Sequence, residues 1–244
     1  MKGHVYLVGA GPGDPELMTV KGLRILRSAD TVVYDALTDR SLLNECRGAE
    51  LIDVGKRSSR HTKTQDEINR ILTEHGMKGR TVVRLKGGDP FLFGRGAEEV
   101  RALREAGVSV SVVPGVSSSI AVPELAGIPV THRDHASMVT FVTGHEKDGK
   151  ASSTDWSRMP GYGTLVVLMG MSNASSIADG LMKGGMSPDT PAAVTVNGST
   201  PEQRTAVTTL KDLAGTIERE GLRAPGIITI GSAVSERDIL GDLM

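Results

Sequence analysis

The stretch VRLKGGDPFLFGRGAEE, residues 83–99, joins an expected strand to an expected helix and contains more unusual residues than a connecting turn requires. It holds four glycines and two of the chain's three phenylalanines. Gly87 and Gly88 lack a Cβ, so the main chain can approach a ligand closely and adopt positive φ, and Asp89 can add a carboxylate there. An ordinary Gly-Asp-Pro turn explains neither the doubled glycine nor the phenylalanines, and we therefore predict a ligand-binding turn.

A second glycine-rich turn, VGAGPGDPELMT (residues 8–19), follows the first expected strand, where a dinucleotide-binding protein has its phosphate loop. In the pattern G-x-G-x-x-G, however, Asp14 replaces the third glycine and Glu16 follows it. Two carboxylates at a helix N-terminus would repel a diphosphate. An adenosyl cofactor without phosphates, such as the sulfonium cation S-adenosylmethionine, avoids this repulsion. A tight turn with Asp14 as the N-cap is an equally good interpretation.

The elements that must position these turns alternate between strands and helices along the chain. Segments rich in β-branched residues are expected strands: His4–Val8, Thr31–Tyr34, Leu51–Val54, Thr81–Leu85, Ser109–Val113, Met138–Thr143, Thr164–Leu168, Ala192–Val196 and Ile227–Ile230. Helical spacing of apolar residues is clear in residues 20–26 and 65–72, and Thr64 with Glu67 forms a capping-box signature. The alternation predicts an α/β fold.

Two domains account for this pattern better than one. Nine strands exceed the usual sheet of about 5–6 strands, and glycine and proline punctuate the segment between Pro114 and His135. We therefore place a boundary near residues 113–118 and predict one α/β domain in residues 1–115 and another in residues 116–244. A cleft between two such domains is a common place for a ligand.

The overall charge argues against a protein that binds polyanions in general. The chain has 28 basic and 29 acidic residues, so an anionic ligand must be held by local clusters. The segment GKRSSRHTK, residues 55–63, is one such cluster, but no aromatic residues accompany it as a nucleic-acid site would require. We also find no signal peptide and no membrane-spanning apolar run, and we expect a cytoplasmic protein that binds neither nucleic acid nor membranes.

Histidines raise the question of a metal site. His132 and His135 lie close together in THRDH, and His145 is a possible third ligand. Helix breakers surround them, and we favour hydrogen-bonded or substrate-facing histidines over metal ligands. The single cysteine, Cys46, is interpreted as a small buried apolar residue.

Together the motifs resemble the tetrapyrrole methylase family, and in particular its uroporphyrinogen-III C-methyltransferases, from end to end. The matching segments are VGAGPGDPELMT, VVYDAL, VGKR, LKGGDPFLFGRGAEE, PGVSSS, GIPVTHR, VTGHE, LMGM and PAAVTVNGSTPEQR. The resemblance implies S-adenosylmethionine folded in a trough between two α/β domains, S-adenosylhomocysteine as a product, no metal, and a homodimer. The implied reaction is methylation of uroporphyrinogen III at C2 and C7, giving precorrin-2 for sirohaem or cobalamin.

The resemblance also implies a role for individual residues. In the first domain, Asp35 would be the general base and Lys56 the proton donor. The implied cofactor contacts are Pro12, Gly87, Gly88, Asp89, Leu92, Ser117, Ser118, Met169 and Gly198, so the second domain would complete the cofactor site. Arg57, Arg95 and Arg133 would bind the carboxylates of the substrate. The PGVSSS segment departs from the family's usual Thr-Ser-Ala or Thr-Ala ending, although serine keeps the hydroxyl group.

Simpler interpretations stand beside these roles: Asp35 as a strand-end cap, Lys56 as a surface lysine, and Met169 as a core residue. Other function classes also remain open. They are a tetrapyrrole methylase acting on a later corrin intermediate or on diphthamide, an NAD(P)-linked oxidoreductase, and a tetrapyrrole carrier without catalytic activity.

Overall fold

The computed structural model describes residues 3–55, 63–144 and 154–244. The chain divides into two compact units, Met1–Ser117 and Ser118–Met244, so the division lies two residues from the predicted boundary. Each unit contains its own sheet with helices packed on it. This is the α/β class that the sequence predicts.

The first unit is built on a five-stranded parallel sheet with the order β3-β2-β4-β1-β5. The strands are β1 (His4–Gly9), β2 (Thr31–Tyr34), β3 (Glu50–Asp53), β4 (Thr81–Lys86) and β5 (Ser109–Val113). Each agrees with a predicted strand to within one residue at either end. Because all five run in one direction, their C-terminal ends lie along the same edge of the sheet.

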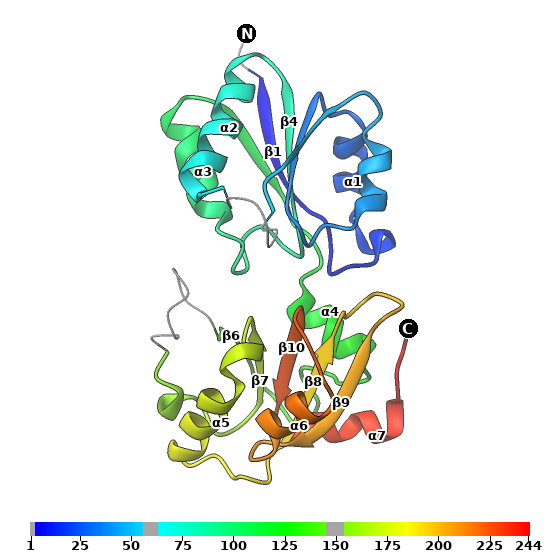
Figure 1. Cartoon of the computed structure of the whole chain (residues 1–244), viewed down its shortest axis with the longest axis vertical. Helices are drawn as coiled ribbons and strands as arrows, with labels where there is room; N and C mark the ends of the chain where they lie inside the picture. The colour runs from blue at the N-terminus through cyan, green and yellow to red at the C-terminus, as the bar shows by residue number, and fades with distance from the viewer. Residues whose placement is uncertain (1–2, 56–62, 145–153) are drawn as a thin grey trace. The chain divides into compact units, whose positions relative to one another are not determined.

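Helices cover both faces of this sheet, as Figure 1 shows. On one face α2 (Gln65–Met77) and α3 (Gly96–Glu105) pack Leu72 and Leu103 against Leu7 and Val33 of the strands. On the other face lie α1 (Val20–Arg27) and the short 3₁₀ helix η2 (Arg40–Glu45). They pack against the strand residues whose side chains point to that face. Both faces are buried, which explains the nearly continuous apolar runs of the strands.

The start of α2 confirms the predicted capping box. The Thr64 hydroxyl accepts a hydrogen bond from the Glu67 main-chain N–H at 3.2 Å, and the Glu67 carboxylate accepts one from the Thr64 N–H at 2.6 Å. The pair satisfies two N–H groups that the first turn of a helix leaves without partners.

The second unit has a mixed sheet with the order β6-β7-β10-β8-β9, in which only β6 and β7 are parallel neighbours. The strands are β6 (Val139–Thr143), β7 (Thr164–Leu168), β8 (Pro191–Val196), β9 (Arg204–Thr209) and β10 (Gly226–Ile230). Strand β9 was not predicted, since it is an edge strand in which Ala206 is the one buried residue. Because β10 runs against both β7 and β8, these two strands end at the same edge of the sheet.

The helices of the second unit also cover both faces of its sheet. They are α4 (Ser118–Leu125), α5 (Ala174–Lys183), α6 (Leu213–Arg219) and the short α7 (Arg237–Leu240). The second unit also contains the 3₁₀ helices η4 (Trp156–Arg158), η5 (Met171–Asn173) and η6 (Ser232–Glu236), and the first unit contains η1 (Pro15–Leu17). Helices α5 and α6 pack on one face, and Val122 of α4 packs on the other.

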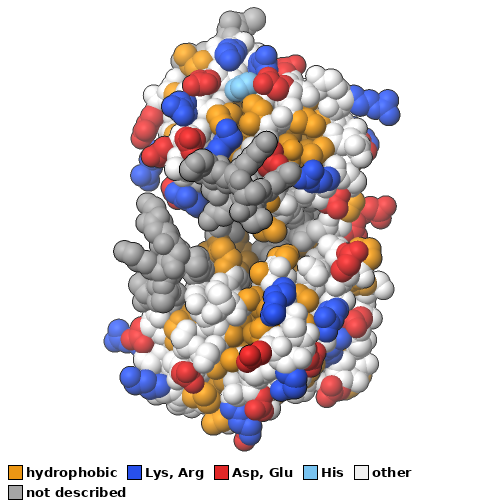
Figure 2. All heavy atoms as spheres, in the orientation of Figure 1, with side chains coloured by type: hydrophobic (Ala, Val, Ile, Leu, Met, Phe, Trp, Pro, Cys, Tyr) orange, Lys and Arg blue, Asp and Glu red, His pale blue; other side chains and the backbone are white. Residues whose placement is uncertain are grey.

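The surface agrees with the near-zero net charge. On the face seen in Figure 2, basic and acidic side chains of the described residues are interspersed on both units. No helix within the described residues is long and apolar enough to cross a membrane.

His75 makes the stability of the first unit dependent on pH. Its buried ring lies 3.3 Å from the Thr31 hydroxyl and 3.4 Å from Arg80 Nη1, and since Arg80 can only donate, the ring nitrogen there is an acceptor. Burial lowers the pKa of His75 below 6.5, and the nearby Glu50 carboxylate offsets this only in part. The folded protein therefore holds His75 neutral.

We expect the free energy of unfolding to fall as the pH drops below 6.5, because the unfolded chain takes up the proton before the folded chain does. His75→Gln should reduce this acid-dependent loss, as measured by urea unfolding between pH 7.5 and 5. His4, whose pKa is also lowered by burial, is unchanged in both proteins and sets the residual slope. Identical pH dependence in the two proteins would contradict the role of His75.

Candidate active site

Loops that follow four strands of the first unit meet at the C-terminal edge of the parallel sheet. They are residues 9–19 after β1, Asp35 and its neighbours after β2, residues 87–92 after β4, and residues 114–117 after β5. In open α/β sheets, this edge is where ligands bind. Both glycine-rich turns therefore lie where the sequence predicts a site.

Three glycines let these loops pack main chain against main chain. A Cβ added to Gly115 would lie 2.3 Å from the Gly88 carbonyl oxygen and 2.7 Å from Cα of Gly9, so no side chain fits between them. Gly88 has a φ of 65°, and its N–H donates to the Gly11 carbonyl at 2.7 Å. The conformation of Gly88 favours glycine at that position, and its carbonyl oxygen leaves no room for a side chain on Gly9 or Gly115.

Gly87 differs from Gly88. A Cβ at this position would meet Leu37 Cβ at 3.3 Å, a contact that a shift of a few tenths of an ångström in the main chain of the Leu37 loop would relieve. Packing within the unit therefore does not explain why residue 87 is a glycine, and a ligand that approaches the main chain remains the better explanation.

The Asp89 carboxylate shapes the loop that contains it. Its Oδ1 accepts from the N–H groups of Phe91 at 2.8 Å and Leu92 at 3.2 Å, and its Oδ2 accepts from the Gly115 N–H at 3.1 Å. Both oxygens are thus used in holding two loops together. Sequence reasoning had assigned Asp89 to the ligand alone.

The loops after β1, β4 and β5 carry no cation. Residues 9–19, 87–92 and 114–117 contain no Lys or Arg, and their charged residues are Asp14, Glu16 and Asp89. Asp14 caps η1 by accepting from the Glu16 N–H at 2.8 Å, as in the N-cap interpretation of the sequence. Such an edge suits a neutral or cationic ligand better than a diphosphate.

Asp35, the predicted base, follows β2 at this edge. Its side chain is 31% exposed, and Oδ1 accepts a hydrogen bond of 2.6 Å from Nη2 of Arg84, which is 2% exposed. One side of the carboxylate is therefore fixed by a buried guanidinium, while the other is open. Arg84 is a site residue that the sequence did not predict. It alternates with Val82 and Lys86 on one face of a central strand, and a charged residue at such a buried position indicates a specific partner.

The predicted cationic residues differ in how far they are free to bind a ligand. Arg95 holds Glu98 with two hydrogen bonds of 2.9 and 2.6 Å, and these raise the pKa of its guanidinium. Arg133 is exposed. Lys56 and Arg57 lie outside the residues that the structure describes.

In the second unit, Met169 and Gly198 follow β7 and β8, the two strands that end at the same edge. Met169 is half exposed, which excludes the core interpretation. A Cβ on Gly198 would meet Val122 Cγ2 at 2.4 Å, so packing on α4 already requires this glycine. Ser118 is the first residue of α4.

Left-handed backbone conformations mark the same motifs. Within residues 3–55, 63–144 and 154–244, the non-glycine residues with positive φ are Phe93, Arg95, Met169, Asn197 and Ser199. All five lie in FLFGRG, LMGM or VNGST. Backbone strain of this kind is concentrated in functional sites.

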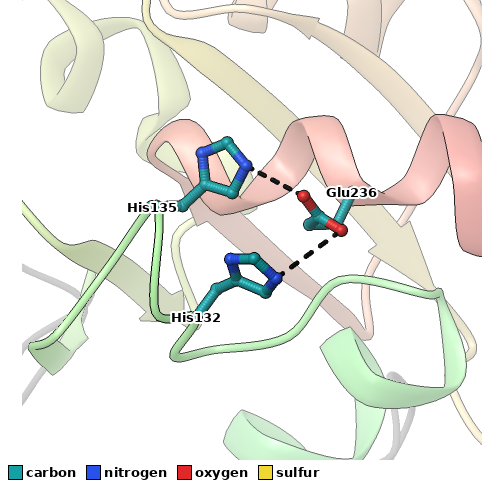
Figure 3. A group of neighbouring side chains, drawn as sticks. All are labelled: His132, His135 and Glu236. Carbon is teal, nitrogen blue, oxygen red and sulfur yellow. Dashed lines mark ion pairs between the residues drawn. The ribbon is translucent and has the colours of Figure 1, made fainter.

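A cluster of two histidines and a glutamate lies in the second unit, and Figure 3 shows both rings pointing toward Glu236. His135 Nε2 is 2.8 Å from Glu236 Oε1, and His132 Nε2 is 3.8 Å from Oε2. His132 Nδ1 accepts from the Asp134 N–H at 3.2 Å, so in the neutral ring Nε2 carries the proton and faces the carboxylate. The arrangement is that of hydrogen-bonded histidines, and a metal would require the other tautomer of His132.

Comparison with known proteins shows extensive similarity. The family model "Tetrapyrrole (Corrin/Porphyrin) Methylases" matches residues 4–214. The S-adenosyl-L-methionine-dependent uroporphyrinogen III methyltransferase of Methanosarcina barkeri is 49% identical, over 98% of this chain and 95% of the relative. Siroheme synthase of Azotobacter vinelandii is 46% identical, over 98% of this chain and 52% of the relative. The crystal structure of uroporphyrin-III C-methyl transferase from Thermus thermophilus complexed with S-adenyl homocysteine has a TM-score of 0.82 and 41% identity, and covers 96% of this chain and 99% of that one.

The packing of the glycine loops predicts different costs for two substitutions. Gly115→Ala should lower the free energy of unfolding by about 1–3 kcal/mol, because its methyl group overlaps main-chain atoms. Gly87→Ala should cost less, about 0.5 kcal/mol, since its nearest contact, Leu37 Cβ at 3.3 Å, is relieved by a small shift of the loop. Urea unfolding measures both. Equal losses would contradict the close approach of the Gly9, Gly88 and Gly115 backbones.

Proposed function

The chain belongs to the tetrapyrrole (corrin/porphyrin) methylase family, and from this premise we propose that it transfers methyl groups from S-adenosylmethionine to C2 and C7 of uroporphyrinogen III, giving precorrin-2. The observation that carries the proposal is the 49% identity, over almost the full length of both chains, to the S-adenosyl-L-methionine-dependent uroporphyrinogen III methyltransferase of Methanosarcina barkeri. Similarity to a siroheme synthase supports a place in sirohaem or cobalamin synthesis.

The residues at the edge of the first sheet fit S-adenosylmethionine. When bound, it supplies an electrophilic methyl group on a sulfonium, and loops without Lys or Arg but with three carboxylates favour such a cation. The proposed contacts from the first unit are Pro12, Gly87, Gly88, Asp89, Leu92 and Ser117, and those from the second are Ser118, Met169 and Gly198. Asp89 would act by shaping the turn that carries Gly87.

Asp35 is the proposed base. The nucleophile is an electron-rich pyrrole carbon, and after it has gained a methyl group the macrocycle must lose a proton. The open side of the Asp35 carboxylate can accept this proton, while Arg84 holds its other side at 2.6 Å. Lys56 remains the proposed proton donor.

The substrate's eight carboxylates are the proposed partners of Arg57, Arg95 and Arg133. Arginine suits this task because its planar fork binds a carboxylate through two hydrogen bonds. Arg95 already makes such a pair with Glu98, so a substrate carboxylate would have to displace or share that partner. Arg133 is exposed, and within the described part of the chain no carboxylate pairs with it. We further propose that the protein is a cytoplasmic homodimer.

Replacing the base tests both the reaction and its residue. With uroporphyrinogen III and methyl-labelled S-adenosylmethionine under anaerobic conditions, the protein should add two methyl groups, measured by product mass and label. Asp35→Asn keeps the shape of the side chain but cannot take up the proton, and the rate should fall about 10²- to 10⁴-fold. Asp179→Asn, an exposed change on α5, is the control.

Other outcomes separate the parts of the proposal. Two methyl groups added equally fast by both proteins would leave the function standing and exclude Asp35 as the base. No methylation of uroporphyrinogen III by the unaltered protein would overturn the proposed function.

The cofactor site gives a separate prediction. Gly87→Ala should weaken binding of S-adenosylmethionine roughly 5- to 150-fold, because the new methyl group occupies space that the ligand needs, at a cost of about 1–3 kcal/mol. Isothermal titration calorimetry measures this directly. Gly161→Ala, at a site with no atom within 4 Å of the added Cβ, is the control. Unchanged affinity would remove Gly87 from the cofactor site.

A further inference from the structure

The first unit buries three charged side chains behind Asp35. Arg84 and Lys86 lie on the face of β4 that α2 and α3 cover, and Glu99 lies on α3. Their side chains are 2%, 5% and 0% exposed. None of the three was assigned a role from the sequence.

Glu99 is the centre of this cluster. A single oxygen, Oε1, accepts from Arg84 Nε at 3.0 Å, from Lys86 Nζ at 3.1 Å and from Gln65 Nε2 at 3.2 Å. Arg84 in turn donates from Nη2 to Asp35 at 2.6 Å. These hydrogen bonds form a continuous network from Lys86 through Glu99 and Arg84 to the partly exposed carboxylate of Asp35.

The planar geometry of the arginine side chain makes this hydrogen-bond network rigid. A guanidinium is planar, so fixing Nε also fixes the direction in which Nη2 points. Arg84 Nη1 is held as well, near the carbonyl oxygens of Val33 at 3.4 Å and Leu85 at 3.3 Å. With its Nε held by Glu99, the Arg84 side chain has one orientation available, and that orientation places Nη2 on Asp35.

Stability alone does not explain the cluster. Two cations and two carboxylates balance in charge, but burial removes water from each charged group, which costs free energy. Apolar residues of similar volume in such positions often give a protein of equal or greater stability. Burial and the neighbouring Arg84 lower the pKa of Lys86 although it contacts Glu99, which shows that desolvation is not fully offset. Glu99 Oε2 has no hydrogen-bond partner among the described residues. An arrangement with these costs indicates a functional constraint.

We propose that Glu99 is a positioning residue for methyl transfer: it holds Arg84 so that the guanidinium fixes Asp35 in its reactive orientation, and Lys86 balances the charge. The proposal rests on the proposed function, in which Asp35 takes up the proton. Gln65, at the first turn of α2, joins that helix to the same carboxylate.

Double-mutant kinetics test this role. Glu99→Gln should lower kcat for methylation of uroporphyrinogen III roughly 10- to 100-fold, with a smaller change in KM, because the base is misplaced and the substrate contacts are intact. In the Asp35→Asn background, Glu99→Gln should cause no further loss, since its effect passes through Asp35. A purely structural role predicts that the two losses multiply, and that result would overturn the proposal.

A charge-balanced variant guards against simple misfolding. Glu99→Gln alone leaves two buried cations with one carboxylate, whereas Glu99→Gln with Lys86→Met leaves one of each. The double variant should regain resistance to urea unfolding while kcat stays low, because the uncharged amide oxygen of glutamine holds Arg84 Nε less tightly than the carboxylate does. Recovery of kcat together with stability would show that only folding was affected and would overturn the proposal. Glu105→Gln, an exposed change on the same helix, should leave both quantities unchanged.

A spectroscopic readout does not depend on the reaction. The ¹⁵Nε–¹Hε signal of Arg84 should be protected from solvent exchange in the unaltered protein and in Glu105→Gln, and should be less protected in the charge-balanced variant. Equal protection in all three would show that the negative charge of Glu99 is not what holds Arg84, and would overturn the proposal. If the unaltered protein does not methylate uroporphyrinogen III, the proposed function fails and the role of Glu99 in this reaction fails with it, whereas a multiplicative loss in an active protein refutes Glu99 alone.

Discussion

A charge that leaves water must meet an opposite charge, and the first unit satisfies this requirement with one connected set of side chains. Glu99 on α3 accepts from Arg84 and Lys86 on β4, and Arg84 reaches Asp35 at the end of β2. Gln65 brings the start of α2 to the same oxygen. Two strands and two helices are therefore fixed to one another at the end of the sheet where ligands bind, so packing and chemistry share the same residues.

Around this set, the edge of the sheet combines close main-chain packing with a negative electrostatic character. Gly9, Gly88 and Gly115 bring three loops into direct backbone contact, and Asp89 ties two of them with its carboxylate. No lysine or arginine lies in these loops. Rigid loops that contain carboxylates and no cations favour a positively charged or neutral ligand over an anionic one.

The sequence could predict what local patterns determine. Nine strands and the capping box at Thr64 follow from alternation and spacing, and the structure has them. It could not predict β9, since an edge strand with one buried alanine has no apolar alternation. Nor did it identify Glu99, because a charged residue in a helix is ordinarily exposed and its partner Arg84 becomes its neighbour only across the intervening loop. The contacts of Asp89 with its own loop were missed for the same reason, since Gly115 is distant in the chain.

The place of β1 within its sheet has a consequence for synthesis of the chain. It is the first strand made, yet its neighbours are β4 and β5, which are the last strands of the unit. The apolar segment HVYLVG thus has no partner until Lys86 has left the ribosome, a delay of roughly 4–15 s at typical rates of translation, and its second partner follows later with Val113. During that interval an unpaired, β-forming segment is open to aggregation or to capture by a chaperone. Translation speed over the first half of the message, more than the intrinsic rate of strand pairing, then limits how soon the sheet can form.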